Sequence, residues 1–91
     1  MKNILYTLAL LISFSSYGQT SEEYYKMGYE KDFAKDYSGA ISDFTKSLEL
    51  DPNSWSGSYA RGLSKYRIKD YYGSIADYTK SIEILNASID K

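Results

Sequence analysis

The side chains that could do chemistry in this chain are tyrosines, acids and bases, because two other reactive types are missing. The 91 residues include 11 Tyr, but no Cys and no His. This composition excludes thiolate nucleophiles, disulfides, zinc–thiolate sites and the usual general base of neutral pH. The acidic residues show no metal-binding spacing, and no glycine-rich phosphate loop is present. We therefore expect a protein that is not an enzyme and that holds neither a metal nor a cofactor.

The tyrosines form two stripes whose spacing favours binding rather than catalysis. Tyr25, Tyr29 and Phe33 are spaced i, i+4, i+8, so on a helix they make one continuous line. A matching line further along the chain consists of Tyr59, Leu63 and Tyr66. Tyrosine combines contact area with a hydrogen-bonding tip, which suits an extended peptide or a partner helix. The alternative is that these rings pack between neighbouring helices.

The elements that position these stripes come from an internal duplication. The segment ISDFTKSLEL at 41–50 returns as IADYTKSIEI at 75–84, displaced by 34 residues. Aligning residues 21–54 with 55–88 gives 14 identical pairs in 34 positions. A fixed offset of this length is typical of helical-repeat proteins.

Each copy contains two helical patterns. Ile41, Phe44 and Leu48 lie at i, i+3, i+7, which marks one face of a helix, and the pattern recurs in the second copy. Pro52 disfavours helix in the residue before it and ends the second pattern. We expect antiparallel helices, no β-structure, and loops of about two to four residues. The predicted helices span residues 21–34, 37–50, 54–68 and 71–85, with N-caps at Thr20, Asp36, Asn53 and Asp70.

Several other residues have expected structural roles. Gly28 and Gly62 should let the two helices of each repeat approach closely. Four acidic residues are expected on outward, solvated helix faces: Asp43, Asp77, Glu49 and Glu83. A basic group near the end of the third helix suits the helix dipole, with contact to an anion as the alternative, and it consists of Lys65, Arg67 and Lys69.

The duplicated unit resembles the tetratricopeptide repeat, a 34-residue helix-turn-helix module. The resemblance rests on Gly at the eighth position, Ala at the twentieth, an aromatic at the twenty-fourth and Pro at the thirty-second. The first copy fills these positions with Gly28, Ala40, Phe44 and Pro52. The second copy matches through Gly62, Ser74 and Tyr78, and departs from the pattern at Ser58, Arg61 and Asn86. The resemblance implies an all-α fold, a short α-solenoid of about four helices. Repeat 1 covers about 21–54 and repeat 2 about 55–88, within a domain at 19–91.

In that family the first helix of each repeat lines a concave groove in which ligands sit. The resemblance places ten residues of this chain on the groove: Glu22, Tyr25, Tyr29, Asp32, Phe33, Ser56, Tyr59, Leu63, Tyr66 and Arg67. The implied function is a non-catalytic protein–protein interaction module that binds a peptide or a partner helix. The alternatives are a structural subunit of an envelope assembly and a glycan-binding module.

Residues 1–18 have the pattern of a bacterial-type signal peptide. Lys2 supplies a positive start, residues 4–12 form an apolar run, and small residues end the segment at Gly18. At ~1.5 Å per residue the run covers only about half of a ~30 Å hydrocarbon core, so we expect no stable membrane insertion after cleavage. The mature chain is expected in the periplasm or outside the cell.

The charge balance and the repeat number bear on the partners. With 11 basic and 12 acidic residues and a net charge of −1, the chain offers no electrostatic reason to bind nucleic acid. Repeat proteins of this kind need about three repeats or a capping helix, and residues 86–91 are too few for one. We therefore expect self-association through the first or fourth helix, giving a homo-oligomer, or else marginal stability.

Overall fold

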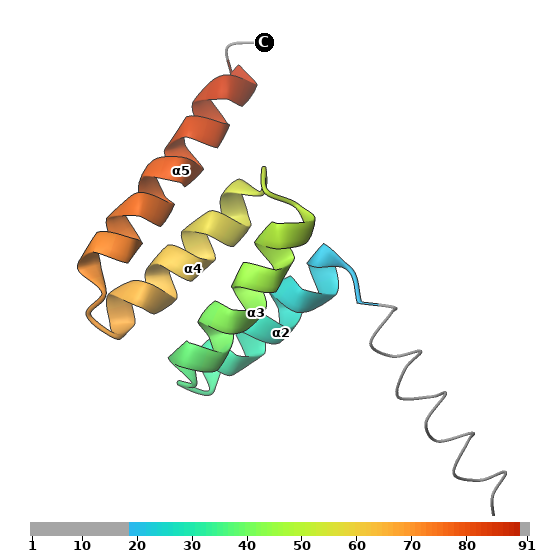
Figure 1. Ribbon diagram of the computed structural model, residues 1–91, viewed down its shortest axis with the longest axis vertical. Coiled ribbons are helices and arrows are strands. Elements are labelled where there is room, and N and C mark those ends of the chain that lie inside the picture. Colours follow the sequence, from blue (N-terminus) through green and yellow to red (C-terminus); the bar gives the residue numbers. More distant parts are fainter. Residues whose placement is uncertain (1–18, 90–91) are drawn as a thin grey trace, which may run out of the picture.

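The structure, a computed structural model, describes residues 19–89 as four helices joined by short turns (Figure 1). They are α2 (Ser21–Phe33), α3 (Tyr37–Leu50), α4 (Trp55–Arg67) and α5 (Tyr71–Ile89). Each helix packs against the next and runs antiparallel to it. This part of the chain contains no strand, and the predicted all-α class is confirmed.

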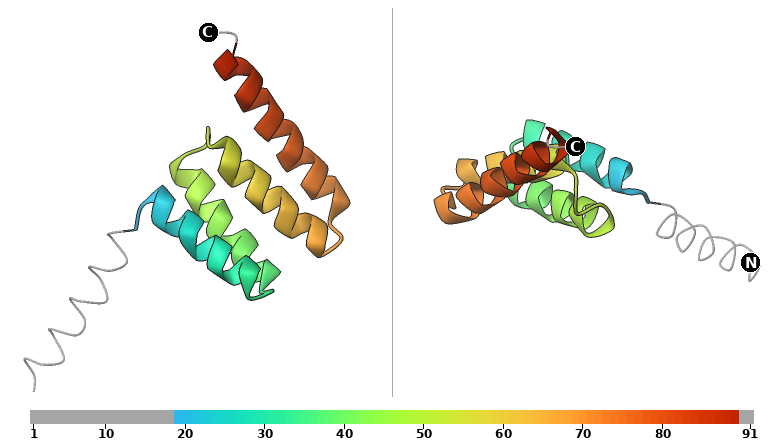
Figure 2. Two further views of the ribbon diagram at one scale, coloured as in Figure 1. Left: turned by 180° about the vertical axis from the view of Figure 1, so that it is seen from behind. Right: turned by 90° about the horizontal axis from the view of Figure 1, so that it is seen from above.

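The helices form a row with α5 at one edge. Among the described helices α5 packs only against α4, so its outer side carries no neighbour (Figure 1, Figure 2). Within residues 19–89, none of the helices is both long enough and apolar enough to cross a membrane. The predicted signal peptide, residues 1–18, lies outside the described residues.

The predicted bounds agree with the first three helices to within one residue at each end. The fourth prediction is too short, because α5 continues to Ile89, about one turn beyond the expected end at Leu85. The residues after Leu85 contain no Gly or Pro that would stop a helix. The extra turn places Ile89 on the exposed surface of α5.

A tight turn joins the helices within the first pair. The backbone N–H of Asp36 donates to the carbonyl oxygen of Lys31 at 2.8 Å, and that of Lys35 donates to Asp32 at 2.9 Å. These two bonds make a Schellman motif. Lys35 has φ 65°, in the left-handed region that glycine usually occupies. The Asp36 side chain then caps α3 by accepting a hydrogen bond from the Gly39 N–H at 3.0 Å.

The second pair repeats this turn. Lys69 has φ 67°, and the N–H of Asp70 donates to the carbonyl oxygen of Lys65 at 2.9 Å. The Asp70 side chain accepts from the Gly73 N–H at 3.0 Å. One aspartate therefore ends one helix and begins the next in each repeat. The predicted caps Asp36 and Asp70 are confirmed.

The caps of the other two helices differ in how well they were predicted. Thr20 accepts a hydrogen bond from the Glu23 N–H at 3.1 Å, as expected for the cap of α2. The prediction of Asn53 as the cap of α4 is wrong. Ser54 caps this helix, and its hydroxyl accepts from the Gly57 N–H at 3.0 Å. Asn53 lies one residue too early in the turn.

The core lies where α2, α3 and α4 meet, and it is small. Ala40, Phe44 and Ala60 are its buried hydrophobic residues, and Tyr25 packs against them. A Cβ at Gly28 would lie 2.6 Å from the Phe44 ring, closer than real Cβ contacts come. The glycine is therefore what lets α2 and α3 approach, as predicted.

The second pair uses the same contacts in a looser form. A Cβ at Gly62 would lie 3.0 Å from the ring of Tyr78, which replaces Phe44. Ser74 takes the place of Ala40 and is also buried. The predicted close approach at Gly62 is confirmed, with more room than in the first repeat.

Buried serines fasten the two helices of each repeat. The Ser47 hydroxyl donates to the carbonyl oxygen of Ser21, and the Ser21 hydroxyl donates to that of Ser47, both at 2.8 Å. In the second repeat Ser81 donates to the carbonyl oxygen of Trp55 at 3.0 Å. These bonds satisfy polar groups that the packing removes from water.

Candidate functional site

An aromatic cluster occupies the α2 side of the predicted groove. The rings of Tyr25 and Tyr29 lie edge to face with centroids 4.9 Å apart. Phe44 lies 5.8 Å from the first ring and 5.7 Å from the second. Tyr25 is therefore part of the core packing, whereas Tyr29 is about half exposed. Of these two predicted residues, Tyr29 is the one that a ligand can reach.

The Tyr29 hydroxyl is held as a neutral hydrogen-bonding group. Its side-chain hydrogen bond with Tyr25, burial, and the nearby charge of Asp32 together raise the pKa of Tyr29 to about 12. The phenol stays protonated at all physiological pH values and can donate or accept a hydrogen bond.

The two stripes end in exposed rings. Phe33, the last residue of α2, is 91% exposed. Tyr66 on α4 is more than half exposed, and its ring lies 5.5 Å from that of Tyr71. Leu63, one turn earlier on α4, is half-buried. Phe33 and Tyr66 are thus the most accessible aromatic residues of the predicted groove.

Tyr59 differs from the other groove residues because it lies against α5. Its ring lies 5.5 Å from that of Tyr78. Both belong to a largely apolar open hollow of about 560 Å³ between α4 and α5, lined by Trp55, Tyr59, Tyr78, Ser81, Ile82 and Leu85. The predicted aromatic stripe is therefore divided between two surfaces.

The two charged residues at one end of the predicted groove contact each other. The Ser64 hydroxyl donates to Asp32 Oδ1 at 2.9 Å, and Arg67 Nε lies 3.9 Å from the same oxygen. The Arg67 guanidinium also lies over the Tyr37 ring, 5.6 Å from its centroid. A hydrogen bond with Tyr37 and the charge of Asp32 raise the pKa of Arg67. These contacts join the C-terminal ends of α2 and α4.

The opposite end of the predicted groove is polar. Glu22 and Ser56 lie there on the rim of an open hollow of about 370 Å³, lined by Ser21, Glu22, Tyr25, Ser47, Asp51, Ser54 and Ser56. The structure therefore brings together Glu22, Tyr25 and Ser56 at one end, and Asp32 and Arg67 at the other. Tyr59 lies in the hollow beside α5 instead.

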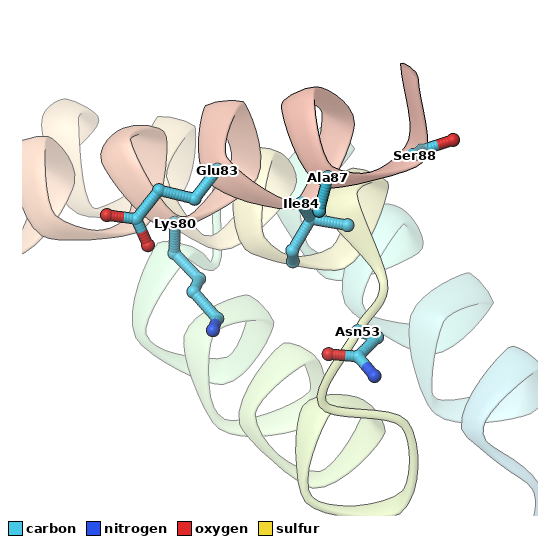
Figure 3. Close-up of a pocket in the computed structure, with 6 residues that line it drawn as sticks. All are labelled: Asn53, Lys80, Glu83, Ile84, Ala87 and Ser88. Carbon is cyan, nitrogen blue, oxygen red and sulfur yellow. The ribbon is translucent and has the colours of Figure 1, made fainter. Parts of the chain in front are cut away.

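A further hollow lies between α5 and the turn after α3 (Figure 3). It has a volume of about 320 Å³ and is lined by Asn53, Lys80, Glu83, Ile84, Ala87 and Ser88. Lys80 and Glu83 lie on this side of α5, away from Tyr78 and Ile82. In the part of the chain that the structure describes, no group of three acidic, His or Cys residues could hold a metal ion.

Two buried aspartates correct a prediction. Asp43 is 3% exposed and Asp77 is 5% exposed, so the expected position on solvated faces is wrong for both. Glu49 and Glu83 are exposed, as predicted. Lys31 Nζ on α2 lies 2.8 Å from Asp43 Oδ2 and compensates the buried charge. A charged side chain can occupy the packed face of α3 because a cation from α2 reaches it.

Asp77 is at the centre of a larger network. Arg61 Nε and Nη2 donate to its two oxygens at 2.9 and 2.8 Å, and Lys65 Nζ lies 3.1 Å from Oδ2. Burial alone would raise the pKa of Asp77, but the hydrogen bonds from Arg61 and Lys65 outweigh it and hold the pKa below 3.8. Arg61 Nη1 also donates to Thr45 Oγ1 at 3.2 Å, so the network joins α3, α4 and α5.

In the sequence, Arg61 stands out only as a departure from the repeat pattern. One signal was present: an aspartate recurs at 43 and 77, and a cation replaces Met27 at the matching position of the second repeat. A charged residue on a helix face that otherwise carries small and apolar side chains needs a partner of opposite charge when it is buried.

Comparison with known proteins assigns the chain to no family. No protein-family model matches it, and no curated protein matches it significantly. The resemblance to tetratricopeptide repeats therefore stays a prediction from the sequence pattern.

Proposed function

We propose that this chain is an exported, non-catalytic scaffold of the tetratricopeptide-repeat type, which binds a peptide or a partner helix along the first helices of its two repeats. The observation that carries the proposal is the exposure of aromatic rings on α2 and α4. Phe33, Tyr29 and Tyr66 are each between about half and almost fully exposed. We propose that these rings form one surface, as exposed aromatic residues of a binding site typically do.

The dimensions of this surface set the size of the ligand. From Glu22 to Phe33, α2 rises by about 17 Å at 1.5 Å per residue. An extended peptide of about five residues spans that length. Polar groups mark the two ends, with Glu22 and Ser56 at one and the Asp32–Arg67 pair at the other. The site therefore suits a short segment with an apolar or aromatic centre and polar ends.

The test compares partner capture by matched variants of the exported protein. The double variant Phe33→Ala with Tyr66→Ala removes one exposed ring from α2 and one from α4. Tyr25 is left in place, because it packs on the core and its truncation would confuse folding with binding. The control, Tyr72→Ala, removes a ring that is also 91% exposed but belongs to α5.

We expect the captured partner, once purified, to bind the double variant at least about ten-fold more weakly by calorimetry, a loss of about 1.4 kcal/mol. The control should bind like the unchanged protein, and circular dichroism should show the same melting temperature for all three. Equal affinities at equal melting temperatures would contradict the proposal.

A second candidate function, a structural subunit of an envelope assembly, is favoured by the apolar outer side of α5. In that case the Phe33 and Tyr66 substitutions leave the assembly unchanged. Substitutions on α5, at Ile75 or Ile82, would disrupt it instead.

A further inference from the structure

An apolar line runs along the exposed side of α5. Its members are spaced 3, 4, 3 and 4 residues apart, which is the a/d pattern of a helix that packs lengthwise on another helix. We call them the α5 seam: Ile75, Tyr78, Ile82, Leu85 and Ile89. Ile82 is 57% exposed, and Ile75 and Ile89 are exposed further still. The apolar hollow formed with Trp55 and Tyr59 opens beside the seam.

The first repeat shows what covers this kind of surface. Phe44 and Leu48 on α3 correspond to Tyr78 and Ile82 by the 34-residue offset. Leu48 is covered by α4, where a Cβ at Gly57 would lie 3.1 Å from Leu48 Cδ2. Phe44 lies between the rings of α2 and Ala60 of α4. The surface that is a helix–helix interface in repeat 1 is therefore repeated in repeat 2, where no described helix covers it.

The seam carries no charge. The charged residues of α5 are Asp77, Lys80 and Glu83. Asp77 points into the network with α4, and the other two line the hollow on the far side of the helix (Figure 3). Two copies of the seam can therefore meet without opposing like charges or burying an unpaired one.

A head-to-tail arrangement, with α2 of one copy on α5 of the next, is disfavoured by the same reasoning. The residues of α4 that contact α3 include Gly57 and Ala60, which are small. The corresponding residues of α2 are Glu23 and Lys26, which are exposed. Docking that face on Ile82 would bury two charges against an apolar surface. The face of α2 that would meet Ile82 carries Glu23 and Lys26, whereas the α5 seam is apolar.

We infer that the partner is a second copy of this chain, and that two copies associate through their α5 seams about a two-fold axis. Such an interface is closed, because the same surface is used on both subunits. The seam of each copy packs beside the apolar hollow of the other. This pairing goes beyond the proposed function and uses a different surface, so ligands can still reach the predicted groove of both copies.

The test measures the mass of the protein in solution. The full chain is expressed in a host that exports it. The protein is then studied by sedimentation velocity at concentrations on the order of 1–100 µM, a range that covers a micromolar dissociation constant. We expect a dimer. Ile82→Lys should weaken dimerisation at least about ten-fold, since an exposed residue can be replaced without loss of the fold but a lysine cannot enter the seam. Ala76→Lys, exposed but off the seam, should dimerise normally.

Several results would overturn this inference. One such result is a protein that stays monomeric at every concentration tested. This includes a protein that retains residues 1–18 and covers the seam with them. Another is a mass that keeps growing beyond the dimer, because that indicates open, head-to-tail contacts. Dimerisation of Ile82→Lys with unchanged affinity would contradict it too.

A second measurement holds even if Ile82→Lys fails to fold. The chain contains no Cys, so Ile82→Cys introduces the only thiol. We expect oxidation to link most chains into a covalent dimer, whereas Ala76→Cys, the matched control, should remain mostly single. Equal cross-linking of the two variants would overturn the inference. Loss of ligand binding in the groove, tested with Phe33 and Tyr66, would leave this result unaffected.

Discussion

The second helices of the two repeats have nearly the same sequence but different surroundings. Phe44 on α3 is 1% exposed, whereas Tyr78, its counterpart on α5, is half-buried. Leu48 is half-buried, whereas Ile82 is 57% exposed. The cause is that α4 packs on α3, while α5 has no described neighbour on that side. Burial in such a fold is supplied by the following repeat, so two equivalent residues can differ widely in what they contribute to stability.

The polar contacts show the opposite difference. Both repeats have the pair of a lysine on the first helix and a buried aspartate on the second, at Lys31 with Asp43 and at Lys65 with Asp77. Only the second repeat adds Arg61, which makes a bidentate pair with Asp77. The repeat with less apolar cover thus has more charge-assisted hydrogen bonds, which are stronger than neutral ones.

The largest predicted effect tests whether burial by a neighbouring helix decides how much an aromatic residue contributes to stability. Phe44→Ala should cost about 3–5 kcal/mol, as expected for a fully buried ring. Tyr78→Ala should cost about half as much, because one side of Tyr78 faces the open hollow. Urea denaturation followed by circular dichroism, at a protein concentration below that of self-association, gives both values.

Equal losses of stability from Phe44→Ala and Tyr78→Ala would contradict the difference between the two repeats. They would mean that the α5 side of the monomer is covered as well as the α3 side. A matched control is Tyr72→Ala, which removes an exposed ring and should change stability by less than about 0.5 kcal/mol.

Those parts of the fold that depend on nearby residues could be predicted from the sequence. The caps Asp36 and Asp70 were correct because a cap depends on a residue and the three that follow it. The helices themselves follow from apolar periodicity, and Gly28 from its place in the repeat. The end of α5 was missed because the expected end relied on the repeat length, whereas no residue after Leu85 breaks the helix.

The features that the sequence did not predict depend on contacts between distant residues. Asp43 and Asp77 were placed in solvent because they are charged, and only the reach of a cation from a neighbouring helix makes their burial acceptable. The candidate site shows the same limit. Tyr25 and Tyr59 occupy equivalent positions in the repeat, yet one packs on the core and the other lies in an open hollow.

An intermediate effect tests the network of the second repeat through its pH dependence. The pKa of Asp77 lies below 3.8 in the folded chain. A group with a lowered folded pKa stabilises the fold fully above its unfolded pKa, and this stabilisation is lost as the pH falls through the folded pKa. At neutral pH, Asp77→Asn should therefore cost about 1.5–3 kcal/mol, the range for hydrogen bonds to a charged group.

The measurement is the melting temperature of both proteins from neutral pH down to about pH 2. The difference in melting temperature between the two proteins should be constant near neutral pH and should disappear in acid. Glu83→Gln, an exposed acid on the same helix, should differ little from the unchanged protein at any pH. A gap that does not close in acid would show that Asp77 contributes by packing rather than by its charge.

The smallest predicted effect concerns what the two repeats share. Lys35 and Lys69 hold nearly the same left-handed conformation at φ 65° and 67°, which costs an L-residue about 1–2 kcal/mol. Glycine avoids that strain but loses more entropy on folding, so Lys35→Gly and Lys69→Gly should each raise stability by about 0.5–1 kcal/mol. Lys80→Gly, within α5, should lower it by about 1 kcal/mol. Denaturation curves of the three variants decide the matter. Because the turns are built alike, a gain at one and not at the other would show that the difference between the repeats extends beyond their exposed faces to the turns themselves.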